Sequence, residues 1–118
     1  MSDLSLRWND YASCWAAEPQ ERDCRLSHQV TDDVAYRDPG IEVAGRAALA
    51  GYMEGFRGSF PGNRFVIDHV DAHHERSLAR WRQVDDAGTT VMTGASIARH
   101  APDGRLADIT GFFLGPPS

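Results

Sequence analysis

The 118-residue chain contains no lysine, because all twelve of its basic residues are arginine. This absence excludes chemistry that depends on a lysine amine, such as Schiff-base formation, pyridoxal phosphate attachment and the lysine of a phosphate-binding loop. The chain also lacks any apolar run close to the roughly 20 residues that span a bilayer. Its first ten residues lack the basic-then-apolar pattern of a secretion signal. We therefore expect a cytoplasmic protein with no membrane partner.

Positive charge and cysteine are scarce as well. The chain has twelve arginines and 17 acidic residues, so its net charge is −5, and it contains no basic stretch. Nucleic-acid binders need clustered positive charge, so DNA and RNA are not expected partners. Cys14 and Cys24 match no zinc spacing and are expected to be free thiols. His73 and His74 are adjacent on an expected strand and point opposite ways, so no metal site is expected. No cofactor is expected either.

The residues that are present fit a single domain with a core over about residues 4–114. Trp8, Tyr11, Ala12 and Trp15 recur with helical spacing, whereas later segments alternate and are bounded by turn residues. The expected order begins with helices at 4–17 and 20–29, a strand at 31–37 and a helix at 46–60. A meander of four strands follows, at 65–74, 77–84, 89–99 and 105–114.

This order is typical of the α+β class, with three N-terminal helices packed on a curved antiparallel sheet. Such a sheet forms a cone-shaped α+β barrel, and its interior suits a small apolar ligand. In the third meander strand Val91, Ala95 and Ile97 share one face, whereas Met92 and Ala98 lie on the other. Both faces should therefore be covered, and we expect a homodimer through the outer sheet face.

Two segments carry a family resemblance. TDDVAYRDPG followed by IEVAGRAALAGYM (31–53), and APDGRLADITGFF (101–113), resemble SnoaL-like proteins of the nuclear-transport-factor-2-like superfamily. Relatives in that superfamily include ketosteroid isomerase, scytalone dehydratase and polyketide cyclases. The resemblance spans about residues 8–114. The resemblance implies the cone-shaped fold with a small-molecule pocket. It does not indicate one particular activity, because proteins of this fold carry out many different activities.

Asp38 is the first candidate catalytic residue. It ends the expected strand just before Pro39 and Gly40, where its carboxylate would project into the cone; a turn-forming role is the alternative. The resemblance places Asp38 at the general base of ketosteroid isomerase. It also places Ser96 where that enzyme has a hydrogen-bond-donating aspartic acid. Because serine is a weaker acid, this departure argues against steroid isomerisation.

Three further candidates lie on the first two helices. Tyr11 and Trp15 occupy the face of the first helix that should meet the cavity. The resemblance implies an oxyanion tyrosine on this helix, and a gap-free count from Asp38 places Cys14 opposite it, with Tyr11 about one turn away. His28, near the end of the second helix, is a candidate proton partner for Asp38. The alternative for His28 is a favourable interaction with the helix end.

The strand RSLARWRQV (76–84) decides what lines the cavity on the sheet side. Because side chains on a strand alternate between its two faces, Arg80 and Arg82 lie on one face and Trp81 lies on the other. Two arginines are easier to place outside a narrow cavity, so Trp81 is expected to point inward; the opposite phase would place Arg80 inside. With the third helix and the neighbouring strands, the expected ligand-binding residues are Trp15, Tyr52, Phe56, Trp81, Met92, Ile109 and Phe113.

The expected function is small-molecule binding inside the cone. As an enzyme, the protein would be a cofactor-free acid–base isomerase, cyclase or dehydratase acting on an apolar ring compound. Asp38 would be the general base, and Tyr11, His28 or Ser96 would supply a hydrogen bond or a proton. The alternative is a non-catalytic ligand-binding or dimerisation module.

Overall fold

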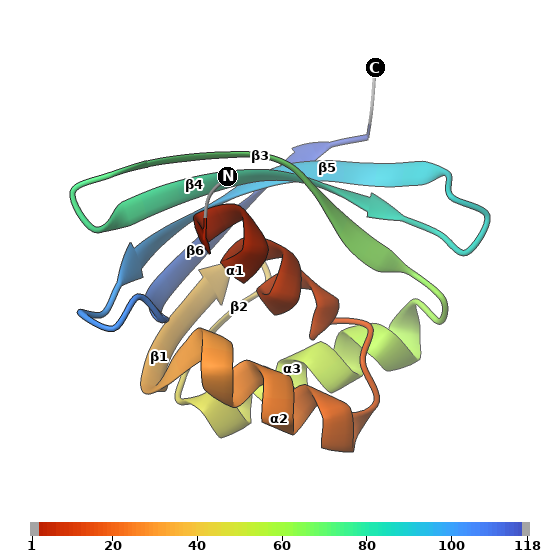
Figure 1. Ribbon diagram of the computed structural model, residues 1–118. Helices are drawn as coiled ribbons and strands as arrows, with labels where there is room; N and C mark the ends of the chain where they lie inside the picture. Colours follow the sequence, from red (N-terminus) through yellow and green to blue (C-terminus); the bar gives the residue numbers. More distant parts are fainter. Residues whose placement is uncertain (1–2, 117–118) are drawn as a thin grey trace.

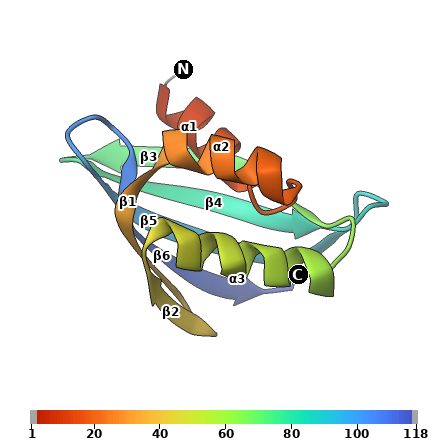
Figure 2. The same cartoon turned by 90° about the horizontal axis from the view of Figure 1, so that it is seen from below.

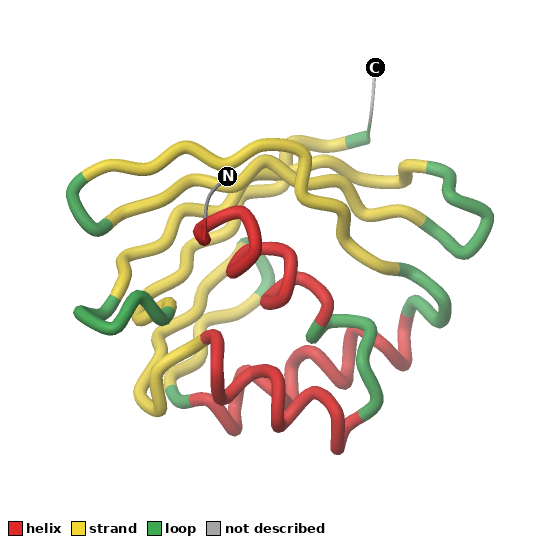
Figure 3. Tube along the Cα trace, in the orientation of Figure 1, coloured by secondary structure: helices red, strands yellow, loops and turns green. Residues whose placement is uncertain are grey.

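Helices and strands account for most of residues 3–116, the part of the chain that the computed structural model describes. The sheet arches over the helices (Figures 1 and 3). The elements are, in chain order, α1 (Asp3–Ser13), α2 (Pro19–Gln29), β1 (Val30–Asp38), β2 (Ile41–Ala44), α3 (Arg46–Ser59), β3 (Arg64–His73), β4 (Arg76–Val84), β5 (Thr90–His100) and β6 (Leu106–Gly115).

The strands form one sheet with the order β2-β1-β6-β5-β4-β3. β1 and β6 run parallel, whereas all other neighbouring pairs are antiparallel. Register shifts occur in β3–β4, β4–β5 and β5–β6. Such irregularities bend strands and increase their twist. The sheet therefore curls, and its concave face receives the helices.

The helices cover the concave face in two tiers. α1 lies nearest the sheet and packs along β3, whereas α2 and α3 lie side by side beyond it (Figures 1 and 2). Arg22 of α2 is fully buried and joins these tiers. Its guanidinium donates to the carbonyl oxygens of Cys14 (2.8 Å) and Ala17 (2.7 Å) and pairs with Glu54 of α3 at 3.0 Å. The segment that carries Trp15 is thereby fixed against α3.

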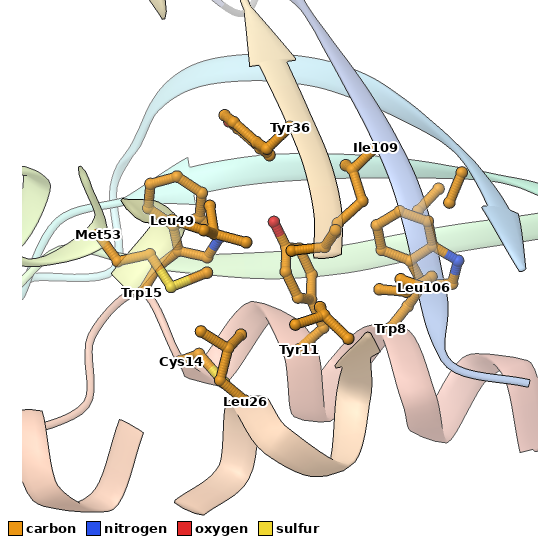
Figure 4. Packing of buried hydrophobic residues seen from close by; sticks show 14 residues of the cluster. Trp8, Tyr11, Cys14, Trp15, Leu26, Tyr36, Leu49, Met53, Leu106 and Ile109 are labelled. Atoms are coloured by element: carbon orange, nitrogen blue, oxygen red, sulfur yellow. The ribbon is translucent and has the colours of Figure 1, made fainter. Parts of the chain in front are cut away.

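The hydrophobic core lies between the concave face and the helices (Figure 4). Its largest fully buried apolar side chains include Trp8, Leu26, Leu49, Met53 and Leu106. The indole N–H of Trp8 donates to the hydroxyl of Ser77 on β4 at 2.9 Å. A buried polar atom needs such a partner, so this bond stabilises α1 against the sheet.

The predicted class is confirmed, with three helices packed on a curved, mostly antiparallel sheet. The first helix is shorter than predicted. It ends at Ser13, and the next residues continue as turns in which Cys14 and Trp15 bond to carbonyls three residues earlier. β2 was not predicted. It forms a tight hairpin with the end of β1, where Asp38 pairs with Ile41. No helix within residues 3–116 is long and apolar enough to cross a membrane.

Candidate functional site

A cavity of about 530 Å³ opens between the concave face of the sheet and helices α1 and α3. Phe60 and Phe113 line it and are half-exposed, so they lie toward its opening. The lining is mostly aromatic, with rings from Trp8, Tyr11, Trp15, Tyr36, Tyr52, Phe56, Phe60, Phe65, Trp81 and Phe113. A cavity of this size and character is suited to a small organic molecule.

Asp38 contributes the cavity's carboxylate from the last position of β1. Its Oδ2 accepts a hydrogen bond of 2.7 Å from the hydroxyl of Tyr36. Tyr36 stands two residues earlier on the strand, so both side chains lie on one face. The backbone N–H of Gly40 donates to Oδ1 at 2.8 Å. Asp38 thus closes the turn to β2 and also faces the cavity, so its two predicted roles are compatible.

Tyr52 of α3 reaches the same carboxylate from the helical side. Its hydroxyl lies 3.1 Å from Oδ1 and 3.0 Å from Oδ2 of Asp38. The carboxylate of Asp38 thus accepts hydrogen bonds from two tyrosine hydroxyls and one backbone N–H. Burial, followed by the hydrogen bond to Asp38, raises the pKa of Tyr52 to about 12. Burial raises the pKa of Tyr36 further, with Tyr11 and Asp38 adding to the effect. Both hydroxyls therefore stay protonated at neutral pH.

Tyr11 of α1 differs from the other two tyrosines because its hydroxyl has no hydrogen-bond partner. The residue is only 5% exposed, yet it lines the cavity. Figure 4 shows its ring rising from α1 with the oxygen pointing toward the space between the helix and the sheet. Burial raises the pKa of this phenol well above its ordinary value. The structure therefore holds a buried, protonated donor without an acceptor.

Trp15 organises the aromatic wall. Its ring centroid lies 5.6–5.8 Å from those of Tyr36, Tyr52, Phe56 and Phe65. Three of these contacts are edge-on, an arrangement that aromatic quadrupoles favour. Because the rings come from β1, α3 and β3, Trp15 joins the wall across three elements.

Trp81 and Ser96 form the sheet side of the cavity. The indole of Trp81 lies against Gly94 on β5, where a Cβ atom would overlap the ring. Its N–H donates to the hydroxyl of Ser96 at 3.0 Å. Ser96 therefore accepts from the protein, and its own proton can point to a ligand. Gly111 separates Ser96 from Asp38, because a Cβ built there would contact both side chains.

The structure brings most of the predicted site residues to this one cavity. Those that line it are Tyr11, Trp15, Asp38, Tyr52, Phe56, Trp81, Met92, Ser96 and Phe113. Arg80 is exposed, which agrees with the inward phase chosen for Trp81. Their roles in binding or catalysis remain predictions.

Two predicted residues lie elsewhere. His28 is exposed on α2, and its Nδ1 lies 2.9 Å from the Cys24 carbonyl of its own helix. The expectation that it faces the cavity as a proton partner for Asp38 is wrong, because its side chain is exposed on α2 and is not among the residues that line the cavity. Ile109 does face inward from β6, opposite Tyr36. It is buried in the core (Figure 4) and is not among the residues that line the cavity.

Sequence reasoning missed Tyr36 as a member of the site. The signal was present, because residues two apart on a strand share a face and Asp38 was already a candidate. It also missed Phe65, Ile67 and Gln83, although Gln83 shares the phase of Trp81. Among the described residues no cluster of histidine, cysteine and acidic side chains is suited to a metal ion.

Comparison with known proteins identifies the family. The sequence profile of the SnoaL-like domain matches residues 10–109. The chain therefore belongs to the SnoaL-like family, and the predicted superfamily is confirmed. No curated protein matches the chain.

Solved structures show the same fold. A protein described as a candidate isomerase of the SnoaL-like family from Agrobacterium tumefaciens is 25% identical, with a TM-score of 0.90 over 98% of this chain and 100% of its own. A SnoaL-like protein of unknown function from Burkholderia thailandensis is 16% identical, with a TM-score of 0.76 over 98% and 99%. AclR, a candidate hydroxylase from Streptomyces galilaeus, is 16% identical, with a TM-score of 0.66 over 92% and 86%.

Proposed function

We propose that the cavity binds an apolar ring compound and that Asp38 is the general base of a cofactor-free proton transfer next to a carbonyl group. The observation that carries this proposal is that the carboxyl group of Asp38 and the unpartnered hydroxyl of Tyr11 line one cavity. The candidate isomerase from Agrobacterium tumefaciens has the same overall fold and supports a reaction of this kind.

The chemistry follows from what each group can accept or donate. An Asp38 oxygen takes the proton from the carbon beside the carbonyl, and the electron pair moves to the carbonyl oxygen. Tyr11 donates a hydrogen bond to that developing oxyanion, and Ser96 is positioned on the sheet side as a second donor. Return of the proton from Asp38 to another carbon completes an isomerisation. Attack of the enolate on a second carbonyl gives cyclisation when the new alkoxide takes the proton back from Asp38. Departure of a β-hydroxyl as water, with that same proton, gives dehydration.

Tyr36 and Tyr52 act as positioning residues for Asp38. Tyr36 holds Oδ2 at 2.7 Å, whereas Tyr52 is shared between the two oxygens at 3.0 and 3.1 Å. The longer, shared contact is the weaker one. We therefore infer that Tyr52 shifts when a proton arrives on the carboxylate.

The test is exchange of the α-protons of 2-tetralone, a ring ketone, for deuterium in D₂O, followed by proton NMR. The wild-type protein is expected to accelerate the exchange over buffer, by an amount that depends on Asp38. If the protein binds 2-tetralone and the exchange rate stays at that of buffer, the proton-transfer proposal fails.

A second candidate function is ligand binding without catalysis. Two points favour it. The resemblance to ketosteroid isomerase places Ser96 where that enzyme has an acid, and the Asp38 oxygens already accept bonds from Tyr36, Tyr52 and Gly40. This function predicts that binding of 2-tetralone raises the melting temperature by mass action while no exchange occurs.

We also propose that a second copy covers the outer sheet face. Because Met92, Ser96 and Phe113 line the cavity, their neighbours point outward. These neighbours are the exposed apolar residues Val91, Ile97, Phe112 and Leu114. Large exposed apolar patches mark interaction sites.

Light scattering after gel filtration tests this arrangement. We expect a mass of twice 13.0 kDa for the wild type and of one chain for Phe112→Arg. The control is Leu6→Arg, which changes another exposed apolar residue, on α1, and should remain a dimer. A wild-type protein that is monomeric at micromolar concentration would contradict the proposal.

A further inference from the structure

The cavity contains a single charged side chain. Of the described residues that line it, only Asp38 carries a formal charge at neutral pH. The other polar lining groups are hydroxyls and one amide, and they are neutral. Any ligand in this cavity therefore meets one negative charge and no positive charge.

The protein does not neutralise that charge with a cation. Within residues 3–116 no arginine or histidine forms an ion pair with Asp38. Arg37, its neighbour in sequence, points to the opposite face of β1 and pairs there with Asp108 and Glu42, each at 2.9 Å. The groups that do contact Asp38 are the neutral donors of Tyr36, Tyr52 and Gly40. These donors are uncharged, so they leave the net charge of the carboxylate in place.

The walls around this charge also favour a cation. The rings of Tyr36 and Tyr52 lie 5.8 Å apart beside the carboxylate, and Trp15 packs against both of them. The face of an aromatic ring attracts ammonium groups, most strongly where water is excluded. Apolar walls also strengthen the attraction between a buried carboxylate and a cation. A carboxylate ligand would meet repulsion from the same features.

We propose that the ligand is an apolar ring compound that carries a protonated amine, bound with its ammonium group beside Asp38 and the rings of Tyr36, Tyr52 and Trp15. This inference rests on the proposed function only in assigning the cavity as the ligand site. It does not depend on proton transfer. Anionic analogues of the same ring compound are expected to bind more weakly than neutral ones.

The test compares three probes that share one ring and differ in charge: 2-phenylethylamine, 2-phenylethanol and phenylacetate. All three tryptophans of the chain line the cavity, so tryptophan fluorescence reports on binding. At pH 7 and low salt we expect the amine to bind at least tenfold more tightly than the alcohol. Phenylacetate should bind more weakly than the alcohol. Equal affinities for the amine and the alcohol, or no binding of the amine, would overturn the proposal.

Two variants locate the effect. Asp38→Asn removes the charge in the cavity and should bring the affinities for the amine and the alcohol within twofold of each other. Asp33→Asn removes the same charge from an exposed position on the same strand and should leave the tenfold preference intact. A preference that persists in Asp38→Asn would show that the Asp38 charge is not its source. A preference that is lost in Asp33→Asn would show that the overall negative charge of the protein is responsible, and either result would overturn the proposal.

A second measurement tests the proposal even if the Asp38→Asn protein fails to fold. On the wild-type protein, 2-phenylethanol must displace 2-phenylethylamine competitively, since both occupy one cavity; independent binding would overturn the proposal. These are equilibrium measurements without turnover. Failure of exchange with 2-tetralone would therefore leave the amine preference standing, and loss of the preference would leave the exchange result standing.

Discussion

The indole ring of Trp81 lies directly against Gly94 on the neighbouring strand. A Cβ atom at Gly94 would overlap the ring and lie 2.5 Å from the carbonyl oxygen of Phe112. Gly94→Ala should therefore force the indole into the cavity, and overpacking of this kind costs about 1–3 kcal/mol of unfolding free energy. Urea denaturation followed by circular dichroism measures the loss.

The matched control is Gly58→Ala on α3. A Cβ atom there meets open space, and alanine in place of a helical glycine stabilises by about 0.5–1 kcal/mol. If the two variants change the free energy of unfolding equally, Trp81 does not lie against Gly94 in solution.

Tyr11→Phe should change stability and activity in opposite directions. Removal of a buried hydroxyl without a partner is expected to raise the free energy of unfolding by about 1 kcal/mol. Removal of the same hydroxyl should slow proton exchange by about 100-fold if it stabilises the oxyanion. Tyr36→Phe is the control for stability, because it removes a 2.7 Å bond to a carboxylate and should lower the free energy. A destabilised Tyr11→Phe protein would show that the hydroxyl has a partner.

Alkaline titration tests the environment of the tyrosines. The chain has three, and the pKa of each is raised, chiefly by burial. Because the folded-state pKa exceeds the ordinary value of 10.0, the folded protein keeps its phenols protonated. The stability they contribute is complete below pH 10.0 and is lost as the pH rises toward about 12, the pKa of Tyr52. Absorbance at 295 nm should show no tyrosinate at pH 10 and a cooperative rise with unfolding above it. A tyrosine that titrates near pH 10 in the folded protein would contradict this placement.

The two thiols should react at different rates. Cys14 is fully buried, and burial raises its pKa to about 11, whereas Cys24 is exposed on α2. Because the thiolate is the reactive form, Ellman's reagent at pH 8 should modify one thiol rapidly and the other only after unfolding. Cys24→Ser provides the control, since it should abolish the rapid phase. Two rapid thiols in the wild type would contradict the burial of Cys14.

Local patterns of apolar residues predicted much of the fold because their spacing indicates which face of a helix or strand is buried. The spacing of Trp8, Tyr11 and Trp15 predicted both the first helix and its cavity-facing side. Alternation around Trp81 predicted its inward phase. The pairing of β1 with β6 joins residues about 70 positions apart, and no local pattern records such a contact. β2 has only four residues, too few for a periodic signal, and forms through its pairing with β1.

The candidate site was predicted in part for the same reason. Alternation gives the face on which a residue lies and does not give its depth. Ile109 has the predicted inward phase, yet the core buries it away from the cavity. The prediction for His28 depended on where α2 lies relative to the other helices, and only the tertiary packing decides that position. The contact between Tyr52 and Asp38 joins a helix to a strand across the cavity. It could not be predicted from local sequence patterns for the same reason.

The most direct test of the account is the rate of 2-tetralone exchange in Asp38→Asn compared with Asp33→Asn. Both variants remove one negative charge from β1, and only the first removes the carboxylate in the cavity. Melting curves of the two proteins show whether each is folded. Loss of a general base typically slows a reaction by about 10²–10⁴-fold. We therefore expect at least a 100-fold loss in Asp38→Asn and a wild-type rate in Asp33→Asn. A folded Asp38→Asn protein that exchanges at the wild-type rate would remove Asp38 from the mechanism and contradict the central claim.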